Sequence, residues 1–262
     1  MKLPFVQIDA FADRPFGGNP AAVIPLEEWL PDAVLQSIAL ENNLSETAFT
    51  VPAEGDADYE LRWFTPACEV ALCGHATFAS GHYLLGDRDA VRFRTRKAGV
   101  LTVRRAGDGY AMDLPVTAMS AQPRPEIAAA LGVPDAPTWA SATDAAEETV
   151  IVLLEDETAV RALQPDFRAL GRHHVMAVPT APGTDTDVVS RVFVPSFGID
   201  EDPVTGSAHA ALVHFWAARL GRPSFTAFQA SARGGRIDCT LDGGRAVLGG
   251  RCVTVIEGSF LL

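Results

Sequence analysis

Two segments, each opening a helix, show that the pattern of this chain repeats in two halves. Cys73-Gly74-His75-Ala76-Thr77 and Thr205-Gly206-Ser207-Ala208-His209 both place a glycine and small or polar residues where a helix is expected to begin. Phe-Thr-Pro at 64–66 precedes the first segment, and Phe-Val-Pro at 193–195 precedes the second. Strand-like and helix-like stretches alternate in both halves, and this predicts an α/β fold.

The apolar periodicity predicts where the elements lie. Helices are expected from Pro31 to about Asn43 and over residues 75–85, 125–131 and 206–220. Strands are expected over residues 3–9, 46–49, 59–63, 91–95, 100–104, 110–114, 150–154, 174–179 and 188–194. Residues 115–125 carry Pro and Ser without an apolar period, which is typical of a linker. Domains are therefore expected at residues 1–115 and 125–262, and it is left open whether the last strand returns to the first domain.

Composition excludes several classes of function. Asp and Glu outnumber Lys and Arg by 33 to 21, for a net charge of −12, which argues against binding of nucleic acid. Arg92, Arg94 and Arg96 are expected on one solvated strand face. The chain has no apolar run of about 18 residues, so no transmembrane helix is expected. The start of the chain does not resemble a signal peptide, and a cytoplasmic location is the expectation.

The cysteines and histidines do not predict a metal site. Cys68, Cys73, Cys239 and Cys252 form no CxxC pair and match no common zinc framework, so reduced thiols are expected. His173 and His174 have no carboxylate at ligand spacing nearby. These residues therefore predict no metal site.

The two helix starts are candidate anion sites. The first turn of a helix carries backbone N–H groups without intrahelical partners and a partial positive charge, so it binds anions. Two such helix starts facing one cleft would bind a carboxylate. They would also stabilise negative charge that develops on the adjacent carbon.

Glu46 is the candidate base. It has no charged neighbour within three residues, and a carboxylate held in a dry cleft can accept a proton near neutral pH. His75, Asp202 and Ser207 are the other candidate site residues. Each of the four also has a simpler explanation. Glu46 could be an exposed strand residue, His75 a capping or packing residue, Asp202 before Pro203 a turn opener, and Ser207 part of a helix cap.

Eight segments in order along the chain favour the functional interpretation. They are Asp9-Ala10-Phe11, Gly18-Asn19-Pro20-Ala21-Ala22-Val23, Asn43-Leu44-Ser45-Glu46-Thr47-Ala48-Phe49, Arg62-Trp63-Phe64-Thr65-Pro66, Leu72-Cys73-Gly74-His75-Ala76-Thr77, Arg191-Val192-Phe193-Val194-Pro195, Gly198-Ile199-Asp200-Glu201-Asp202-Pro203-Val204-Thr205-Gly206-Ser207-Ala208-His209 and Gln229-Ala230-Ser231-Ala232-Arg233-Gly234-Gly235. With these segments the chain resembles the phenazine-biosynthesis isomerase-like family, which shares its fold with diaminopimelate epimerase.

The resemblance implies a fold and a chemistry. The fold would be two similar α/β domains, each a curved, mostly antiparallel sheet around a central helix, with the active site in the cleft between them. The chemistry would be a proton shift on a small carboxylated molecule without metal or cofactor, and members often form homodimers. Glu46 would be the acid/base, supported by His75 and Asp202. The substrate contacts would come from Asn19, Ser207 and the amides of Gly74 and Gly206.

Two alternatives stay open. Racemases of the same fold use two opposed cysteines, and Cys73 precedes Gly74 as one of these does. The matching segment from Asp202 to Ser207 has no cysteine, which favours a small buried thiol for Cys73. The other alternative is a protein that binds small acids without turning them over.

Overall fold

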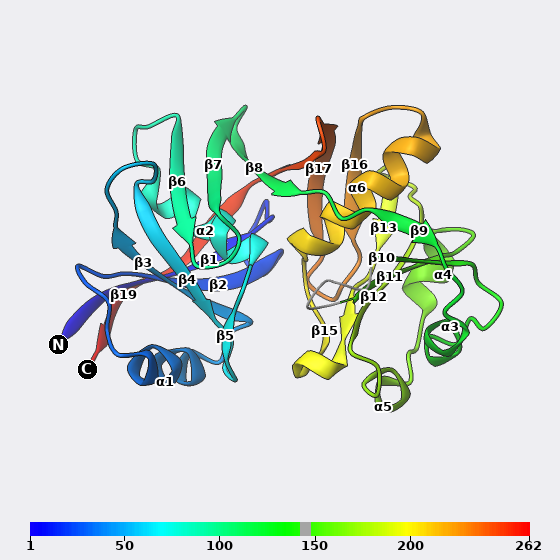
Figure 1. Ribbon diagram of the computed structural model, residues 1–262, viewed down its shortest axis with the longest axis horizontal. Coiled ribbons are helices and arrows are strands. Elements are labelled where there is room, and N and C mark those ends of the chain that lie inside the picture. The colour runs from blue at the N-terminus through cyan, green and yellow to red at the C-terminus, as the bar shows by residue number, and fades with distance from the viewer. Residues whose placement is uncertain (142–147) are drawn as a thin grey trace. The chain divides into compact units, whose positions relative to one another are not determined.

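The computed structural model describes residues 1–141 and 148–262, and the chain divides into two compact units (Figure 1). The first unit contains Met1–Leu114 together with Gly249–Leu262, and the second contains Pro115–Leu248. The last strand, β19 (Cys252–Leu261), pairs antiparallel with the first strand, β1 (Lys2–Ala10). The C-terminal segment therefore completes the first unit.

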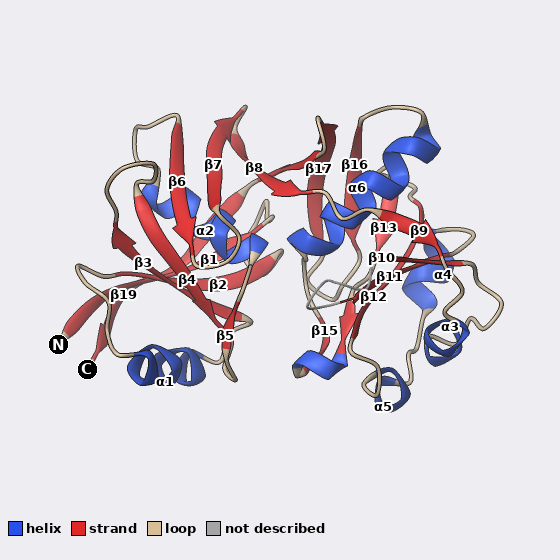
Figure 2. Ribbon diagram, in the orientation of Figure 1, coloured by secondary structure: helices blue, strands red, loops and turns tan. Residues whose placement is uncertain are grey.

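The first unit is mostly strand (Figure 2). Besides β1 and β19, its elements are β2 (Asn19–Pro25), α1 (Asp32–Asn42), β3 (Glu46–Pro52), β4 (Tyr59–Phe64), β5 (Glu69–Val70), α2 (Gly74–Leu84), β6 (Ala90–Thr95), β7 (Val100–Ala106) and β8 (Gly109–Pro115). The strands pair in the order β19-β1-β2-β3-β4-β6-β7-β8. Only the pairs β2·β3 and β4·β6 in this order are parallel.

The second unit repeats this arrangement. Its elements are β9 (Met119–Ala121), α3 (Pro125–Ala130), β10 (Thr138–Ser141), β11 (Glu148–Leu153), α4 (Glu157–Ala162), α5 (Phe167–Leu170), β12 (Val175–Pro182), β13 (Val188–Ser190), β14 (Phe193–Val194), a 3₁₀ turn (Pro195–Phe197), β15 (Ile199–Glu201), α6 (Gly206–Leu220), β16 (Ser224–Gln229), β17 (Gly235–Asp242) and β18 (Arg245–Gly250). The order β9-β10-β11-β12-β13-β16-β17 includes two parallel pairs, β11·β12 and β13·β16.

The parallel strand pairs show which elements of the two units are equivalent. Parallel neighbours need a crossover connection, usually a helix, and every parallel pair here has at least one helix between its strands. In the first unit α1 joins β2 to β3 and α2 joins β4 to β6. In the second, α4 and α5 join β11 to β12, and α6 joins β13 to β16. Helices α2 and α6 are therefore equivalent, as the two similar helix starts in the sequence predicted.

Two expectations about the second half were wrong. Part of the expected linker is a strand, because Met119–Ala121 pairs antiparallel with β10. The strand expected over residues 188–194 is interrupted: β13 ends at Ser190 and β14 begins at Phe193. Both pieces pair with β12, so the interruption bends the chain without removing it from the sheet.

Helix α2 is the central helix of the first unit, and its small residues let the sheet approach closely. All residues from Gly74 to Gly81 are buried, so α2 meets solvent only in its last turn, where Tyr83 is exposed. A Cβ at Gly81 would lie 2.4 Å from Cγ1 of Val103 on β7, so only glycine fits there. The start of α2 is thus set against the strands by tight packing.

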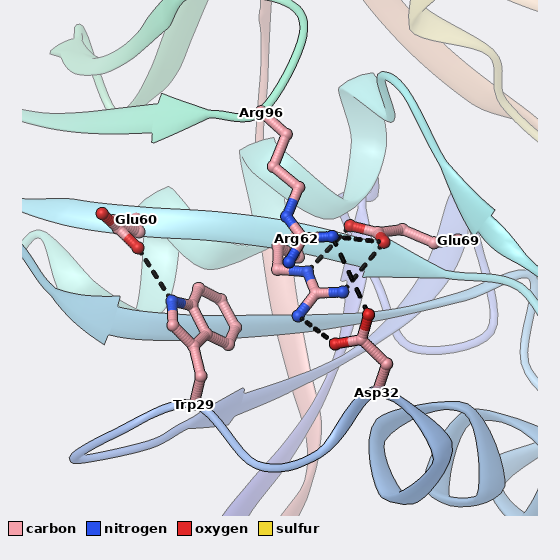
Figure 3. A network of polar contacts seen from close by, with 6 residues as sticks. All are labelled: Trp29, Asp32, Glu60, Arg62, Glu69 and Arg96. Carbon is pink, nitrogen blue, oxygen red and sulfur yellow. Dashed lines mark hydrogen bonds and ion pairs between the residues drawn. The ribbon is translucent and has the colours of Figure 1, made fainter.

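A second constraint acts on the chain just before α2 (Figure 3). Arg62 on β4 is almost fully buried and donates through Nε and Nη2 to both carboxylate oxygens of Glu69 on β5, each at 2.8 Å. It also donates to Asp32, in the first turn of α1, at 2.9 Å. The guanidinium lies 5.1 Å from the ring centre of Trp29 and 5.0 Å from that of Phe64. This network joins α1, β4 and β5, and β5 leads into α2.

Each unit has its own apolar core. In the first unit, one cluster packs α1 against β3 through Leu35, Ile38 and Phe49. In the second, one cluster contains the fully buried Phe193 together with residues of α3, β11 and β12. No helix among the described residues is long and apolar enough to cross a membrane.

Candidate active site

Glu46 and His75 meet at the start of α2. Glu46 is the first residue of β3, and His75 is the second residue of α2. Their side chains contact at 3.1 Å between Oε2 of Glu46 and Nε2 of His75. The Glu46 side chain is only 17% exposed, so it does not lie on a solvated strand face. This geometry suits a carboxylate that is held in one orientation by an imidazole.

Asn19 holds the other side of the His75 ring. It is fully buried at the start of β2, and its Nδ2 lies 3.2 Å from Nδ1 of His75. Ser45 donates its hydroxyl to Oδ1 of Asn19 at 3.2 Å, which orients the amide so that Nδ2 faces the ring. Since Nδ1 of a neutral His75 then accepts, the ring proton is on Nε2. His75 therefore presents an N–H to Glu46 whether it is neutral or charged.

The third neighbour of the ring is a thiol. Sγ of Cys73 lies 3.6 Å from Nδ1 of His75, and Cys73 is only 6% exposed. Burial raises the pKa of Cys73 to about 11, and the Glu46 carboxylate adds to this, so Cys73 is a neutral thiol near pH 7. Burial opposes a charge on His75 too. Cys73 and Glu46 nevertheless outweigh it and hold the pKa of His75 well above its ordinary value.

The start of α2 has no side-chain cap. Cys73, in the capping position, makes no side-chain capping hydrogen bond. Instead the Thr77 hydroxyl donates to the Cys73 carbonyl at 2.6 Å, beside the helical N–H of the same residue at 3.2 Å. The amides of Gly74 and His75 belong to the turn in which N–H groups lack intrahelical partners. This is the local geometry that an anion uses at a helix start.

In the second unit Asp202 is built into the turn that precedes α6. It is 8% exposed, and its carboxylate accepts a hydrogen bond from the hydroxyl of Thr205. The buried amide of Gln229 donates to the Asp202 carbonyl at 2.7 Å and accepts from the backbone N–H of Thr205 at 2.8 Å. Gln229 thus clamps both ends of the Asp202–Thr205 turn.

The start of α6 repeats that of α2 with different side chains. Thr205 caps without a side-chain bond to the first turn, and Nδ1 of His209 donates to its carbonyl at 2.8 Å. His209 is fully buried, and burial lowers its pKa to about 4. Ser207 occupies the position of His75, and its hydroxyl donates to Sδ of Met176 on β12 at 4.0 Å. The first unit therefore carries a carboxylate and an imidazole where the second has Ser and Met.

The sites predicted from sequence fall into two groups. Glu46, His75, Asn19 and Gly74 come together in the first unit. Asp202, Gly206 and Ser207 lie around the start of α6 in the second unit. Cys73 is the small buried thiol that the sequence favoured, and it lies beside His75. Sequence reasoning missed Gln229 and His209 as parts of these groups, although both lie in the family-like segments.

A hollow in the first unit lies away from the acid–base pair. It has a volume of about 200 Å³ and is lined by residues that include Arg62, Glu69 and Arg96. Neither Glu46 nor His75 is part of its lining. Because Arg62 and Arg96 in its lining already pair with Glu69, we assign it to the structural network of Figure 3.

The repeated unit defines the class of the protein, an α/β chain with an epimerase-like fold. A hydroxyproline epimerase from Agrobacterium vitis matches it with a TM-score of 0.63 at 14% identity, over 98% of this chain and 92% of that one. Within this class, the chain belongs to the phenazine biosynthesis-like (PhzC-PhzF) family, whose model matches residues 8–258.

Individual relatives agree with this assignment. An uncharacterized isomerase of Pseudomonas aeruginosa is 47% identical over 267 residues, covering 100% of both chains. The crystal structure of a phenazine biosynthesis protein of the PhzF family from Enterococcus faecalis matches with a TM-score of 0.90 at 41% identity, again over 100% of both chains. The family and these relatives place the chain among isomerases.

Proposed function

We propose that the chain is a cofactor-independent isomerase that moves a proton on a small carboxylated metabolite, with Glu46 as acid and base. The observation that carries the proposal is the contact of 3.1 Å between Glu46 and His75 at the start of α2. A side chain that both takes and returns a proton must keep one position through the reaction. The N–H of His75 and the buried Asn19 behind it supply that constraint.

The start of α2 supplies the second requirement, stabilisation of charge. Removing a proton from carbon beside a carboxylate leaves negative charge on the substrate, which fixed hydrogen-bond donors stabilise. The uncapped amides of Gly74 and His75 are donors of this kind, and they lie on the residue that contacts Glu46 and on its neighbour. The proposed base, Glu46, thus contacts one of the two residues that supply the donors.

For the second unit we propose a supporting role. Gly206 and Ser207 at the start of α6 offer donors to an anionic group, and Asp202 with Gln229 holds the turn that positions them. The kinetic constants of two variants test whether these residues take part in the same reaction. S207A is expected to raise the KM for the substrate, and D202N is expected to lower kcat as well, because it disturbs the turn.

A single base limits the stereochemistry. The second unit has Thr205 and Ser207 at the positions of Cys73 and His75, and neither is a general base at neutral pH. With one acid/base, the proton leaves and returns on the same side of the substrate. This favours an isomerase that moves a proton between two carbons over a racemase that inverts one centre.

Exchange of substrate protons in deuterated water tests the assignment. Candidate small carboxylic acids are incubated with the parent protein and followed by NMR for loss of proton signal. E46Q is expected to slow the exchange by about 10²–10⁴-fold, the usual contribution of a general base. E41Q, at an exposed position of α1, is the matched control and is expected to exchange at the parental rate. Equal rates for E46Q and the parent would rule out Glu46 as the base.

The contact between Cys73 and His75 favours a second candidate, a thiol-dependent racemase. A racemase of that kind needs a thiolate, whereas burial raises the pKa of Cys73 to about 11. C73S therefore separates the two functions: the proposed isomerase keeps most of its exchange rate, and a thiol racemase loses it. A protein that binds small acids by calorimetry and exchanges none of them would be a binding protein.

The homodimer rests on family resemblance alone, and sedimentation equilibrium of the full chain tests it. A mass equal to one chain at all protein concentrations would contradict the homodimer.

A further inference from the structure

Three side chains of different metal-binding types converge at the start of α2. Among the described residues, Glu46, Cys73 and His75 form a group in which one ligand atom from each lies within 4.8 Å of the others. Oε2 of Glu46 and Nε2 of His75 are buried, face each other at 3.1 Å, and make no hydrogen bond to any other described residue. The group thus combines a carboxylate, a thiol and an imidazole, with the facing oxygen and nitrogen in contact only with each other.

This combination of donors selects a particular kind of ion. Zinc, cobalt and cadmium bind thiolate, imidazole and carboxylate together, usually with four ligands in tetrahedral geometry. Magnesium and calcium prefer sets of oxygen ligands, of which this group offers one residue. A divalent ion bound to one thiolate and one carboxylate is also electrically neutral as a unit, which reduces the cost of burying it.

We propose that a zinc-like divalent cation binds Glu46, Cys73 and His75 and, while bound, blocks Glu46 as a base. Cys73 and His75 each release a proton to solvent, and the sulfur and one ring nitrogen then donate lone pairs to the ion. No electron is transferred, and a water molecule completes the coordination. The binding itself is independent of the proposed function, and only the block rests on it.

The geometry requires a small adjustment. Ligand atoms around a tetrahedral zinc lie about 3.3–3.6 Å apart, given bonds of roughly 2.0–2.3 Å. Glu46 faces Nε2 of His75 at 3.1 Å, whereas Cys73 faces Nδ1 at 3.6 Å. Only one imidazole nitrogen binds the ion. Either Cys73 turns toward Nε2, which Glu46 already faces, or Glu46 turns toward Nδ1, which Cys73 already faces. Because all three ligand atoms lie within 4.8 Å of one another, this requires a movement of about 1 Å.

Asn19 prepares the imidazole for this role. Ligating histidines are usually oriented through the second ring nitrogen by a hydrogen bond, and such partners tune metal affinity by roughly 10–100-fold. Asn19 is fully buried and lies 3.2 Å from Nδ1 of His75. When Nε2 binds the ion, Nδ1 carries the proton; the Asn19 amide then flips to accept from it, and the Ser45 hydroxyl turns to accept from Nδ2, so the ring stays fixed.

Cobalt titration of the full chain tests the site without any turnover. Co²⁺ is added after treatment with a chelator, and the near-ultraviolet band of a thiolate bound to Co²⁺ is recorded. One equivalent of Co²⁺ is expected to bind with this band, Zn²⁺ is expected to displace it, and Mg²⁺ is not. C73S is expected to abolish the band, and H75Q and E46Q are expected to weaken binding by more than about 10-fold.

C68S is the matched control, because Cys68 is a free, exposed thiol five positions before Cys73. It is expected to keep the band. Absence of the band in the parent, its persistence in C73S, or its loss in C68S would each overturn the site. A second measurement does not depend on folding of the variants: Co²⁺ should protect Cys73, and not Cys68, from alkylation as read by mass spectrometry.

Proton exchange in deuterated water separates the site from the proposed function. Zn²⁺ at the concentration that fills the site is expected to stop exchange, and chelator is expected to restore it. Exchange that continues at the same rate in protein with Zn²⁺ bound would overturn the block and leave the site standing. If no exchange is found without metal, the proposed function fails and the cobalt spectrum still decides whether the site exists.

Discussion

Thr77 and His209 make the same hydrogen bond at equivalent positions of the two units. Each side chain donates to the carbonyl of the residue that caps its helix, at 2.6 Å from Thr77 and at 2.8 Å from His209. In both cases the backbone N–H of the same residue donates to that carbonyl at 3.2 Å. The Thr77 hydroxyl and the His209 imidazole thus both fix the first turn of their helix through the capping carbonyl. They leave the backbone amides of that turn without a side-chain cap.

The hydroxyl of Thr77, more than its methyl group, is expected to affect substrate binding. T77V removes one hydrogen bond and is expected to destabilise the protein by about 1 kcal/mol. T77S keeps the hydroxyl and loses a buried methyl, which costs a similar amount, about 0.8 kcal/mol. The two variants are therefore expected to lose similar stability in urea unfolding, and only T77V loses the hydrogen bond to Cys73.

The KM for the exchange reaction is the discriminating measurement. If the bond positions the amides of α2, T77V raises KM by up to about fivefold, the equivalent of 1 kcal/mol, and T77S leaves it near the parental value. Equal KM values for the two variants would show that the bond stabilises the helix without positioning its amides.

The sequence predicted the elements better than the contacts between them. Helix α6 begins and ends where the periodicity and the glycine signals placed it, at Gly206 and Leu220. Strand β9 was missed because it has three residues, mostly exposed, so its side chains show no apolar alternation. Its existence depends on backbone pairing with β10, which leaves little trace in a single sequence.

Glu46 and His75 could be nominated from sequence because the family-like segments contain them. The contact of His75 with Asn19 could not, because the two residues are 56 positions apart and meet only through packing of α2 against β2. For the same reason no spacing rule revealed that Glu46, Cys73 and His75 form one group of ligand atoms. Spacing rules describe ligands on one local segment, and these three come from a strand and a helix start.

The buried imidazole of His209 makes stability depend on pH. Burial lowers its pKa from 6.5 to about 4, so below pH 6.5 the unfolded chain binds a proton that the folded chain does not. The contribution is complete above about pH 6.5 and is lost as the pH falls toward 4, by about 3 kcal/mol in total. Urea unfolding of the parent and of H209Q between pH 7 and 4 measures it.

H209Q is the suitable partner because Gln can donate to the Thr205 carbonyl and does not titrate. Acidic groups elsewhere contribute equally to both proteins, so they cancel in the difference. The parent should lose stability faster than H209Q by up to about 1.4 kcal/mol per pH unit in this window. Parallel pH profiles would mean that His209 is protonated in the folded protein at its ordinary pKa.

Arg62 and Arg96 both pair with Glu69, and their burial separates them (Figure 3). The side chain of Arg62 is 3% exposed and that of Arg96 is 55% exposed. R62M removes the bidentate partner of the half-buried Glu69 carboxylate. It is expected to lower the free energy of unfolding by about 2–4 kcal/mol. R96M removes an exposed ion pair and is expected to cost less than about 1 kcal/mol.

Urea unfolding of the two variants, each compared with the parent at neutral pH, checks this difference. R62K adds a further test, because it keeps the charge and loses the two parallel hydrogen bonds. It is expected to fall nearer to R62M than to the parent. Similar losses for R62M and R96M would show that the network of Figure 3 depends on net charge and not on the buried bidentate geometry.

The close approach of α2 to β7 gives a prediction about packing. A Cβ at Gly81 would lie 2.4 Å from Cγ1 and 2.5 Å from Cβ of Val103, which is fully buried. G81A therefore forces the helix away from the strand and is expected to cost about 1–3 kcal/mol. V103A alone leaves a cavity and is expected to cost about 2 kcal/mol.

The double variant G81A/V103A identifies the cause. The alanine methyl at position 81 can occupy space that Val103 vacates, so the combined loss of stability should be smaller than the sum of the single losses by about 1–2 kcal/mol. Urea unfolding of all four proteins completes the cycle. Additive losses would mean that position 81 needs glycine for its backbone and not for its distance from β7. In the coupled case, G81A should also impair proton exchange more than V103A does, because displacing α2 moves His75 relative to Glu46.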